Sequence, residues 1–260
     1  MNFESKVVLV TGGSAGIGKA TALEFGRRGA KVVIAARGVQ QGEECAHEII
    51  SSGREAHFVR ADMAQPDEIR HMVEETVRRF GRLDCAVNNA AVEGFPLKPL
   101  ADVAESVFDQ VMAVNLKGVW FCMKHEINQM LSQEKTGGAI VNISSVNGLG
   151  GTRGASAYAA SKAGVIALIK SAALEYASAG VRINVLAAGA FETPMLNRVK
   201  DQLGGARAQA EEAYKSLIPM GRIGSPKEAA NTIVWLCSDE ASYVTGHSMI
   251  ADGGLSAPMR

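Results

Sequence analysis

The sequence of 260 residues predicts a doubly wound α/β protein, with a parallel sheet of about seven strands and helices on both faces. Short apolar runs of strand length alternate with longer helical patterns along the whole chain. The apolar runs are nearly continuous and rich in Val and Ile, which is typical of parallel strands covered on both faces. No linker or low-complexity segment interrupts the alternation, so residues 1–260 are predicted to form a single domain.

The elements follow one another in a regular order, and each strand-to-strand crossover is expected to be right-handed. The apolar runs predict strands at Val7–Thr11, Lys31–Ala36, Ala56–Arg60, Leu83–Asn88, Gly138–Ser144, Val181–Leu186 and Ser248–Ala251. The longer patterns between them predict helices at Ile17–Arg28, Val39–Ser52, Asp67–Phe80, Val103–Ser132, Ala157–Ala179 and Lys227–Ser238.

The segment Ala190–Pro219 is the least regular part of the chain. It contains the pair Gly204-Gly205, several charges and only weak periodicity. A long insertion of this kind inside a compact domain is usually a lid or a binding loop, so we expect a substrate loop at about 190–219. The charged residues Arg198, Lys200 and Arg207 are interpreted as solvated loop charges.

Composition and charge exclude several classes of protein. Acidic and basic residues number 27 each, so nothing in the net charge favours nucleic acid or an anionic membrane as a partner. No apolar run approaches the roughly 20 residues that span a bilayer, and the first residues show no signal-peptide pattern. The four cysteines are scattered and are read as reduced thiols, so a cytoplasmic protein is expected.

A metal site is also not expected. The pair His125-Glu126 has Gln129 at the position where a second zinc-binding histidine would have to stand.

A glycine-rich turn follows the first predicted strand. Within Thr11–Gly18, Gly12, Gly16 and Gly18 allow a tight turn, a close approach of backbone to ligand, and close contact between helix and sheet. The N-terminus of the following helix then offers free N–H groups to a pyrophosphate. No lysine followed by Ser or Thr ends the turn, so it is not the loop of an NTPase. The position favours binding of a dinucleotide.

The end of the second strand indicates which dinucleotide. An acidic residue there would bind the 2′-hydroxyl of NAD, but the strand ends Ala35-Ala36-Arg37. A guanidinium suits a 2′-phosphate, so we predict NADP, with NAD the less favoured cofactor. The alternative is a surface arginine that only ends the strand.

Tyr158 and Lys162 stand four residues apart in a predicted helix, so their side chains share one face. A nearby cation favours the phenolate and lowers the pKa of a tyrosine, as a reaction that moves a proton on and off an alcohol oxygen requires. Taken alone, such a pair is more often a packed ring beside a solvated amine. Other segments decide between the two interpretations.

In combination, these segments resemble the short-chain dehydrogenase/reductase family over almost the whole chain. The resemblance is to the single-domain branch that includes 3-oxoacyl-acyl-carrier-protein reductases and many bacterial alcohol dehydrogenases. The segments that carry it are Thr11–Gly18, Asp62-Met63, Asn88-Asn89-Ala90-Ala91, Asn115, Ile143-Ser144-Ser145, Tyr158–Lys162, Asn184-Val185 with Gly189 and Thr193, and Asp252-Gly253-Gly254.

The resemblance implies a Rossmann fold and a role for each matching residue. The implied catalytic residues are Tyr158 as general acid/base, Ser145 as hydrogen-bond donor to the substrate oxygen, Lys162, which lowers the tyrosine pKa and holds the nicotinamide ribose, and Asn115, which positions a water. The implied cofactor-binding residues are Gly12, Ser14, Gly16, Ile17, Gly18, Arg37, Asp62, Met63, Asn89, Ala90, Tyr158, Lys162 and Thr193. Ser145 could instead only end a strand, Asn115 could satisfy a helix irregularity, and Asp252-Gly253-Gly254 is interpreted as a turn.

Three positions depart from the family pattern. Ala91 replaces a glycine, so its methyl group is expected to push the backbone slightly away from the cofactor. Ala188 replaces a proline, which frees the backbone that enters the 190–219 segment. Ala15 stands where some NADP-binding members have a basic residue, so the NADP prediction depends on Arg37 alone.

The resemblance therefore implies an oxidoreductase that transfers hydride between NADP(H) and a ketone/secondary-alcohol substrate, and the family's assembly as a homotetramer. The alternatives are a relative that eliminates halide without nicotinamide, which would lack the glycine turn, and a non-catalytic NADP-binding sensor or scaffold, which would have lost Tyr158 or Lys162. The substrate pocket is expected near Val92–Leu97, Val146-Asn147, Gly189-Ala190 and the 190–219 segment, but its shape is not legible from the sequence.

Overall fold

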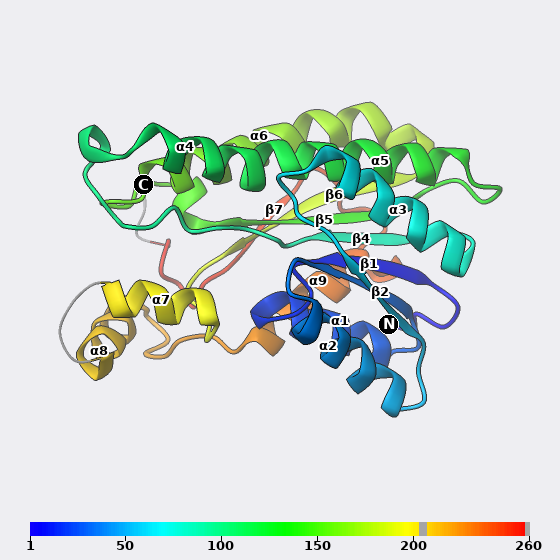
Figure 1. Ribbon diagram of the computed structural model, residues 1–260, viewed down its shortest axis with the longest axis horizontal. Helices are drawn as coiled ribbons and strands as arrows, with labels where there is room; N and C mark the ends of the chain where they lie inside the picture. The colour runs from blue at the N-terminus through cyan, green and yellow to red at the C-terminus, as the bar shows by residue number, and fades with distance from the viewer. Residues whose placement is uncertain (203–206, 258–260) are drawn as a thin grey trace.

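The computed structural model describes residues 1–202 and 207–257, and Figure 1 shows a sheet between two layers of helices. The seven parallel strands are β1 (Val7–Thr11), β2 (Lys31–Ala36), β3 (Ala56–Arg60), β4 (Cys85–Asn88), β5 (Gly138–Ser145), β6 (Val181–Ala188) and β7 (Ser248–Ala251). Their spatial order is β3-β2-β1-β4-β5-β6-β7. The strand order reverses between β1 and β4, which is where ligands bind in sheets of this type.

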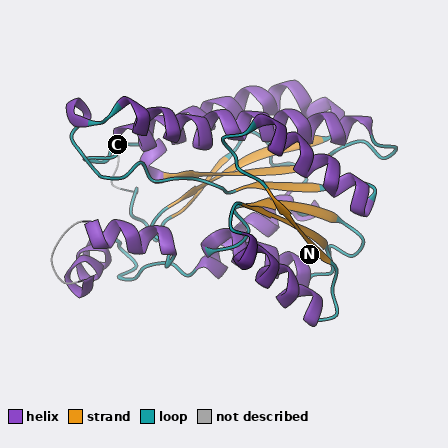
Figure 2. Ribbon diagram, viewed as in Figure 1, coloured by secondary structure: helices purple, strands orange, loops and turns teal. Residues whose placement is uncertain are grey.

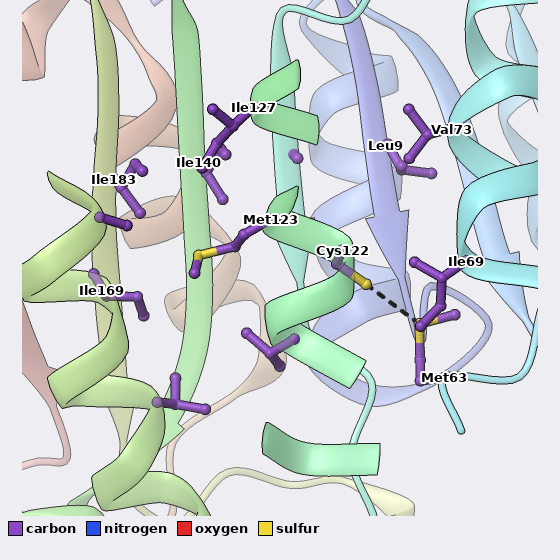
Figure 3. Close-up of a cluster of buried hydrophobic side chains, with 14 of the residues drawn as sticks. Leu9, Met63, Ile69, Val73, Cys122, Met123, Ile127, Ile140, Ile169 and Ile183 are labelled. Carbon is purple, nitrogen blue, oxygen red and sulfur yellow. Dashed lines mark hydrogen bonds between the residues drawn. The ribbon is translucent and has the colours of Figure 1, made fainter. Parts of the chain in front are cut away.

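Helices cover both faces of the sheet, as predicted. One face carries α1 (Gly16–Arg27), α2 (Val39–Ser51) and α9 (Pro226–Cys237) (Figure 1). The other face carries α3 (Pro66–Phe80), α4 (Glu105–Met112), α5 (Val119–Ser132) and α6 (Ser156–Tyr176). Each face has its own cluster of buried apolar side chains. Figure 3 shows part of the cluster on the face that α3, α5 and α6 cover, where side chains of α5 and α6 meet strand residues such as Ile140 and Ile183.

Local sequence signals account for several helix boundaries. Helix α3 begins with Pro66, has acidic residues in its first turn and basic residues in its last, and ends at Gly81, whose φ is +82°. Helix α9 begins with a capping box between Ser225 and Glu228. Both patterns satisfy or complement the unpaired groups at helix ends.

The predicted helix over Val103–Ser132 is interrupted. Residues Ala113–Gly118 form a π-helical turn between α4 and α5, and Asn115 lies in this turn. The structure also extends β6 two residues beyond the predicted end at Leu186, because Ala187 and Ala188 pair with Ile250 and Ala251 of β7. An alanine at position 188, in place of the family's proline, is compatible with this pairing.

The expectation of a loop over 190–219 is wrong for most of that segment. It contains two helices, α7 (Pro194–Gln202) and α8 (Arg207–Leu217), which Figure 2 shows as a pair beside the sheet. Gly204 and Gly205 lie outside the described residues. Helices α7 and α8 contact one another and enclose a small third apolar cluster that includes Leu196 and Ile218.

One stretch in the described part of the chain is long and apolar enough to cross a membrane by length and composition alone. It is Ser156–Ala179, in which 44% of an apolar window of 18 residues is buried. Lys162, Lys170 and Glu175 interrupt this helix, so it is not a continuous apolar run. The helix packs against β5 and β6 and contains Lys162, which is typical of a core helix.

Candidate active site

A cleft of about 770 Å³ opens at the carboxyl ends of the strands. The ends of β1, β2, β4, β5 and β6 contribute to it, and α7 and α8 form its outer wall. Of the fifteen catalytic and cofactor-binding residues that the resemblance implies, thirteen line the cleft: Gly12, Ser14, Gly16, Ile17, Arg37, Asp62, Met63, Asn89, Ala90, Ser145, Tyr158, Lys162 and Thr193. Gly18 and Asn115 lie behind its surface and support residues that do line it.

The glycine turn has a backbone that few other residues could adopt. Gly12 and Gly16 have φ values of +63° and +53°. A Cβ atom on Gly12 would lie 2.8 Å from the side-chain nitrogen of Asn89, and one on Gly18 would lie 2.2 Å from the carbonyl oxygen of Gly12. Gly18 therefore allows α1 to pack directly under the turn, whereas Gly12 allows the turn to lie against the end of β4.

Asn89 fastens this turn to the end of β4. Its side-chain amide donates to the carbonyl oxygens of Thr11 and Gly12, both at 3.1 Å. In return the Thr11 hydroxyl accepts from the backbone N–H groups of Asn89 (3.0 Å) and Ala90 (3.2 Å). The side chain of Asn89 thus shapes the turn, in addition to lining the cleft.

The N-terminus of α1 is suited to bind an anion. No side chain caps it, and its first turn contains no acidic residue. Its free N–H groups therefore face the cleft beside Gly12 and Ser14. The space that the glycines leave and this uncapped terminus together fit the pyrophosphate of a dinucleotide.

The far end of the cleft carries the residues expected around adenosine. Arg37 follows β2, is exposed, and has no ion-pair or hydrogen-bond partner among the described residues. Asp62 begins a tight turn in which its carboxylate accepts from the N–H of Ala64 at 3.0 Å. Met63 is mostly buried, and its sulfur lies 3.6 Å from the thiol sulfur of Cys122 (Figure 3). Met63 therefore joins the cleft to the core beneath α5.

The end of β5 and the first turns of α6 bring Ser145, Tyr158 and Lys162 together. The Ser145 hydroxyl accepts from the N–H of Asn147 at 3.1 Å and lies close enough to the Tyr158 hydroxyl to lower its pKa. The ammonium of Lys162 lies 5.6 Å from the centre of the Tyr158 ring and donates to the carbonyl oxygen of Ile143 at 2.8 Å. Lys162 is only 2% exposed, and its hydrogen bond to the Ile143 carbonyl holds it under the tyrosine.

The expected direction of the tyrosine pKa shift is wrong for this structure. Burial raises the pKa of Tyr158 to about 12, while the hydrogen bond from Ser145 acts in the opposite direction and Glu93 adds to the rise. The Tyr158 side chain lines the cleft and is partly exposed. Burial also lowers the pKa of Lys162 to about 8. Desolvation therefore outweighs the attraction between phenolate and ammonium that the spacing suggested.

Asn115 fastens the loop after β4. Its side-chain oxygen accepts from the N–H of Val92, and its side-chain nitrogen donates to the carbonyl of Val92, both at 2.9 Å. The same nitrogen lies 3.3 Å from the hydroxyl of Ser161. The side chain of Asn115 thus joins the π-helical turn to the cleft wall and to α6.

The wall opposite the catalytic residues is mostly apolar. Its lining side chains from the last part of the chain are Phe191, Met195, Leu196, Val199, Ala210, Ala213, Tyr214, Leu217 and Leu255. Polar contacts also cross from the described part of this wall to the loop after β4, among them an ion pair between Arg198 and Glu93 and a hydrogen bond of 3.4 Å from the N–H of Leu97 to Gln202.

No local pattern in the sequence indicates these individual contacts. Glu93 is an acid in a loop, and its partner is 105 residues away. The interpretation of Lys200 as a solvated charge is wrong, because its side chain is 4% exposed and lies 3.4 Å from Glu211. Arg198 is half-exposed but paired with Glu93, and nothing is described for the side chain of Arg207.

The turn Asp252-Gly253-Gly254 has the structural role that was expected. The carboxylate of Asp252 accepts from the N–H groups of Gly254 and Ser256, at 2.8 and 2.7 Å. Both glycines have positive φ. A Cβ atom on Gly189 would lie 2.5 Å from the Cβ atom of Asp252, so this turn packs against the end of β6.

Comparison with known proteins connects this architecture with oxidoreductases. A family model described as enoyl-(acyl carrier protein) reductase matches residues 12–256. The chain is 40% identical over 256 residues to 2,5-dichloro-2,5-cyclohexadiene-1,4-diol dehydrogenase of Sphingobium indicum, covering 98% of this chain and 99% of that protein. It is 39% identical over 255 residues to a 3-oxoacyl-acyl-carrier-protein reductase of Thermotoga maritima, covering 98% and 99% of the two chains.

Solved structures show the same fold. The crystal structure of levodione reductase superposes with a TM-score of 0.95 at 35% identity, covering 99% of this chain and all of that one. A short-chain type dehydrogenase/reductase from Mycobacterium marinum gives a TM-score of 0.91 at 31% identity, covering 99% and 98% of the two chains.

Proposed function

Because this chain belongs to the short-chain dehydrogenase/reductase family, we propose that it transfers hydride between NADP(H) and a ketone/secondary-alcohol substrate, with Tyr158 as the general acid/base. The single observation that carries the proposal is the meeting of the Ser145 and Tyr158 hydroxyl groups with the Lys162 ammonium in one cleft. The nicotinamide, when bound, supplies or accepts the hydride.

In ketone reduction, negative charge develops on the substrate oxygen. The hydroxyl groups of Ser145 and Tyr158 donate to that oxygen, and Tyr158 then transfers its proton to it. The Ile143 carbonyl fixes Lys162 under the ring, where its ammonium stabilises the phenolate left behind. The apolar wall of α7 and α8 excludes water, so these short-range interactions act in a medium of low dielectric.

The raised pKa of Tyr158, about 12, gives the two directions different pH dependence. The protonated phenol is the donor in reduction and persists through the neutral range. Alcohol oxidation requires the phenolate, whose fraction rises with pH up to the pKa. We expect the initial rate of oxidation to rise from about pH 6 to about pH 8, the range in which Lys162 keeps its charge, and the rate of reduction to show no parallel rise. Initial rates in both directions across this range test the assignment, and parallel profiles would contradict it.

NADP is proposed as the preferred cofactor on the strength of Arg37. Its guanidinium is exposed at the carboxyl end of β2 and lines the cleft, with no acidic residue at the strand end. A 2′-phosphate on the ribose would supply the partner that Arg37 lacks within the described chain.

The proposed substrate is a compact, neutral and largely apolar ketone or secondary alcohol. The lining of the outer wall is aliphatic and aromatic, and its charged pair, Glu93 with Arg198, is already neutralised. A relative that is 40% identical is named for its action on a cyclohexadiene diol, which is a ring with secondary alcohol groups. Cyclic ketones and their alcohols are therefore the first compounds to test.

A homotetramer in the cytoplasm is proposed, as the family resemblance implies. Large apolar side chains are exposed on the long helical regions on one face of the sheet: Phe108 on α4, Trp120 on α5 and Leu174 on α6. Ile250 on β7 is similarly exposed. Exposed apolar side chains on these elements are suited to burial against a second copy. Light scattering coupled to gel filtration measures the assembly directly, and a monomer would contradict it.

The decisive experiment measures oxidation of NADPH at the expense of a panel of cyclic and open-chain ketones, with NADH in parallel. Turnover of at least one ketone supports the proposal. Tight NADPH binding without turnover of any carbonyl compound would favour the alternative, a non-catalytic NADP sensor or scaffold. Failure to bind either nucleotide would contradict both.

A further inference from the structure

A polar cluster lies in the core beneath the cleft, on the sheet face that α5 covers. It consists of Glu126 on α5, Asn88 on β4 and Asn142 on β5, and their side chains are at most 2% exposed. The amide nitrogen of Asn88 donates to one carboxyl oxygen of Glu126 at 2.9 Å and to the amide oxygen of Asn142 at 3.0 Å. The proposed reaction uses none of these side chains directly.

Two oxygen atoms of this cluster have no partner among the described residues. They are the second carboxyl oxygen of Glu126 and the amide oxygen of Asn88. They belong to the two groups that the 2.9 Å bond already joins. The orientation of the Asn88 amide is fixed by its two acceptors, so its oxygen cannot exchange places with its nitrogen without facing other oxygens. A carboxylate has no hydrogen for that amide oxygen, whereas a carboxylic acid has one.

We propose that Glu126 carries a proton in the folded protein and donates it to the amide oxygen of Asn88, and that this closed acid–amide pair positions the ends of β4 and β5. A proton on the second carboxyl oxygen gives both orphaned oxygens a partner at once. It also removes a negative charge from a site where a charge without a counter-ion would be costly.

Among the described residues, no cation acts on Glu126 to favour its ionised form. The titratable group that interacts with it is the Cys122 thiol on α5, whereas Lys117 of the π-helical turn lies over the Phe121 ring and Lys162 of α6 is bound to the Ile143 carbonyl. Burial raises the pKa of Glu126 to about 8, against a smaller opposing effect of the Asn88 hydrogen bond. Burial, together with the neighbouring Glu126, also raises the pKa of the Cys122 thiol, so burial favours the neutral form of both groups.

The cluster lies directly behind the cleft. Asn88 precedes Asn89, whose side chain shapes the glycine turn, and Asn142 precedes Ile143, whose carbonyl holds Lys162. Glu126 reaches both strands through Asn88. We therefore assign it as a positioning residue for the cofactor and for the catalytic lysine. The proton on Glu126 is independent of the proposed function, whereas the effect on cofactor binding rests on it.

The first test uses Glu126→Gln, which keeps the shape, removes the titration and can donate to the Asn88 oxygen. Glu74→Gln on α3 is the matched control, because Glu74 is exposed. Infrared spectra at about pH 6.5 should show a protonated-acid carbonyl band that Glu126→Gln removes and Glu74→Gln keeps. Absence of the band in the unmutated protein would overturn the proposal, and this holds even if Glu126→Gln fails to fold. The other carboxyl groups with a clear pKa shift are all shifted downward: Glu24, Glu68, Glu75, Glu211, Glu228 and Asp252.

The second test follows unfolding in urea as a function of pH. The folded-state pKa of Glu126 is above its ordinary value, so the folded protein binds the extra proton between about pH 4.5 and about pH 8. Over that window the unfolding constant of the unmutated protein should rise, relative to Glu126→Gln, by about tenfold for each pH unit. The ratio should become constant above about pH 8. A ratio that does not change with pH would overturn the proposal.

The third test measures the dissociation constant of NADPH by fluorescence for both proteins from about pH 7 to about pH 9. Ionisation of Glu126 removes its donor and should weaken binding several-fold more in the unmutated protein than in Glu126→Gln. A constant ratio between the two proteins would overturn the positioning role. If neither protein binds NADPH, the proposed function fails, while the infrared and unfolding tests still decide the proton.

Discussion

The glycine turn and the α7–α8 segment border the same cleft but are held in different ways. The turn is fixed by backbone contacts that only glycine permits and by four hydrogen bonds between Asn89, Thr11 and their neighbours. The α7–α8 segment is joined to the loop after β4 by a half-exposed ion pair and one long hydrogen bond. The glycine turn, on the cofactor side of the cleft, should therefore be rigid and intolerant of substitution. The α7–α8 segment, on the substrate side, should be able to adapt its position.

The largest effect is expected at the catalytic residues between the two sides. Tyr158→Phe should lower kcat by a factor of about 10³ or more, because it removes the proton donor and nothing else. The dissociation constant of NADPH should change by less than about threefold. Tyr214→Phe makes the same chemical change on the α8 wall of the cleft and serves as the control. Steady-state kinetics with an accepted ketone test the pair. Equal losses in both variants would mean that neither hydroxyl has the special role of an acid.

The substitution Gly18→Ala tests whether the glycine turn is rigid because only glycine fits there. The added Cβ atom would meet the carbonyl oxygen of Gly12 at 2.2 Å, so the turn has to move. We expect NADPH affinity to fall by about tenfold or more, together with a lower melting temperature. Gly151→Ala is the control, since a Cβ atom there meets nothing within 4 Å. If Gly18→Ala bound NADPH normally, the cofactor side would be less rigid than its contacts suggest.

The proposed preference for NADPH over NADH depends on the positive charge of Arg37. Arg37→Asp should shift the ratio of kcat/KM for NADPH and NADH toward NADH by about tenfold or more, since a phosphate partner is replaced by an acceptor for ribose hydroxyls. Arg54→Asp makes the same charge change between α2 and β3 and should leave the ratio unchanged, because Arg54 does not line the cleft. An unchanged ratio in Arg37→Asp would remove the basis for the NADP proposal.

The same contrast explains what the sequence could predict. The strands, most helices and the glycine turn follow from local patterns, because apolar periodicity and a required φ are properties of neighbouring residues. Glu93 with Arg198, and Glu126 with Asn88, are pairs between distant segments, so neither partner shows a local signal. The weak periodicity of 194–217 concealed two helices whose stability depends on packing against one another. The pKa of Tyr158 was misjudged for a similar reason, since burial is set by the whole fold.

The smallest effect is expected on the substrate side, at the pair of Glu93 and Arg198. Arg198 is 54% exposed, so the pair should contribute only about 0.2–1 kcal/mol. Arg198→Gln and Glu93→Gln should each raise KM for the ketone by roughly two- to fivefold and change kcat less, because they loosen the α7 wall without touching the reacting atoms.

The double variant of this pair should cost no more than the more affected single variant, because both substitutions break the same contact. Arg222→Gln, which breaks the exposed pair with Glu228 outside the cleft, serves as the control and should leave KM unchanged. Additive losses would mean that Glu93 and Arg198 each contact the substrate independently. A loss of kcat as large as that of Tyr158→Phe would show that the substrate side is as intolerant as the glycine turn, and the contrast between the two sides would fail.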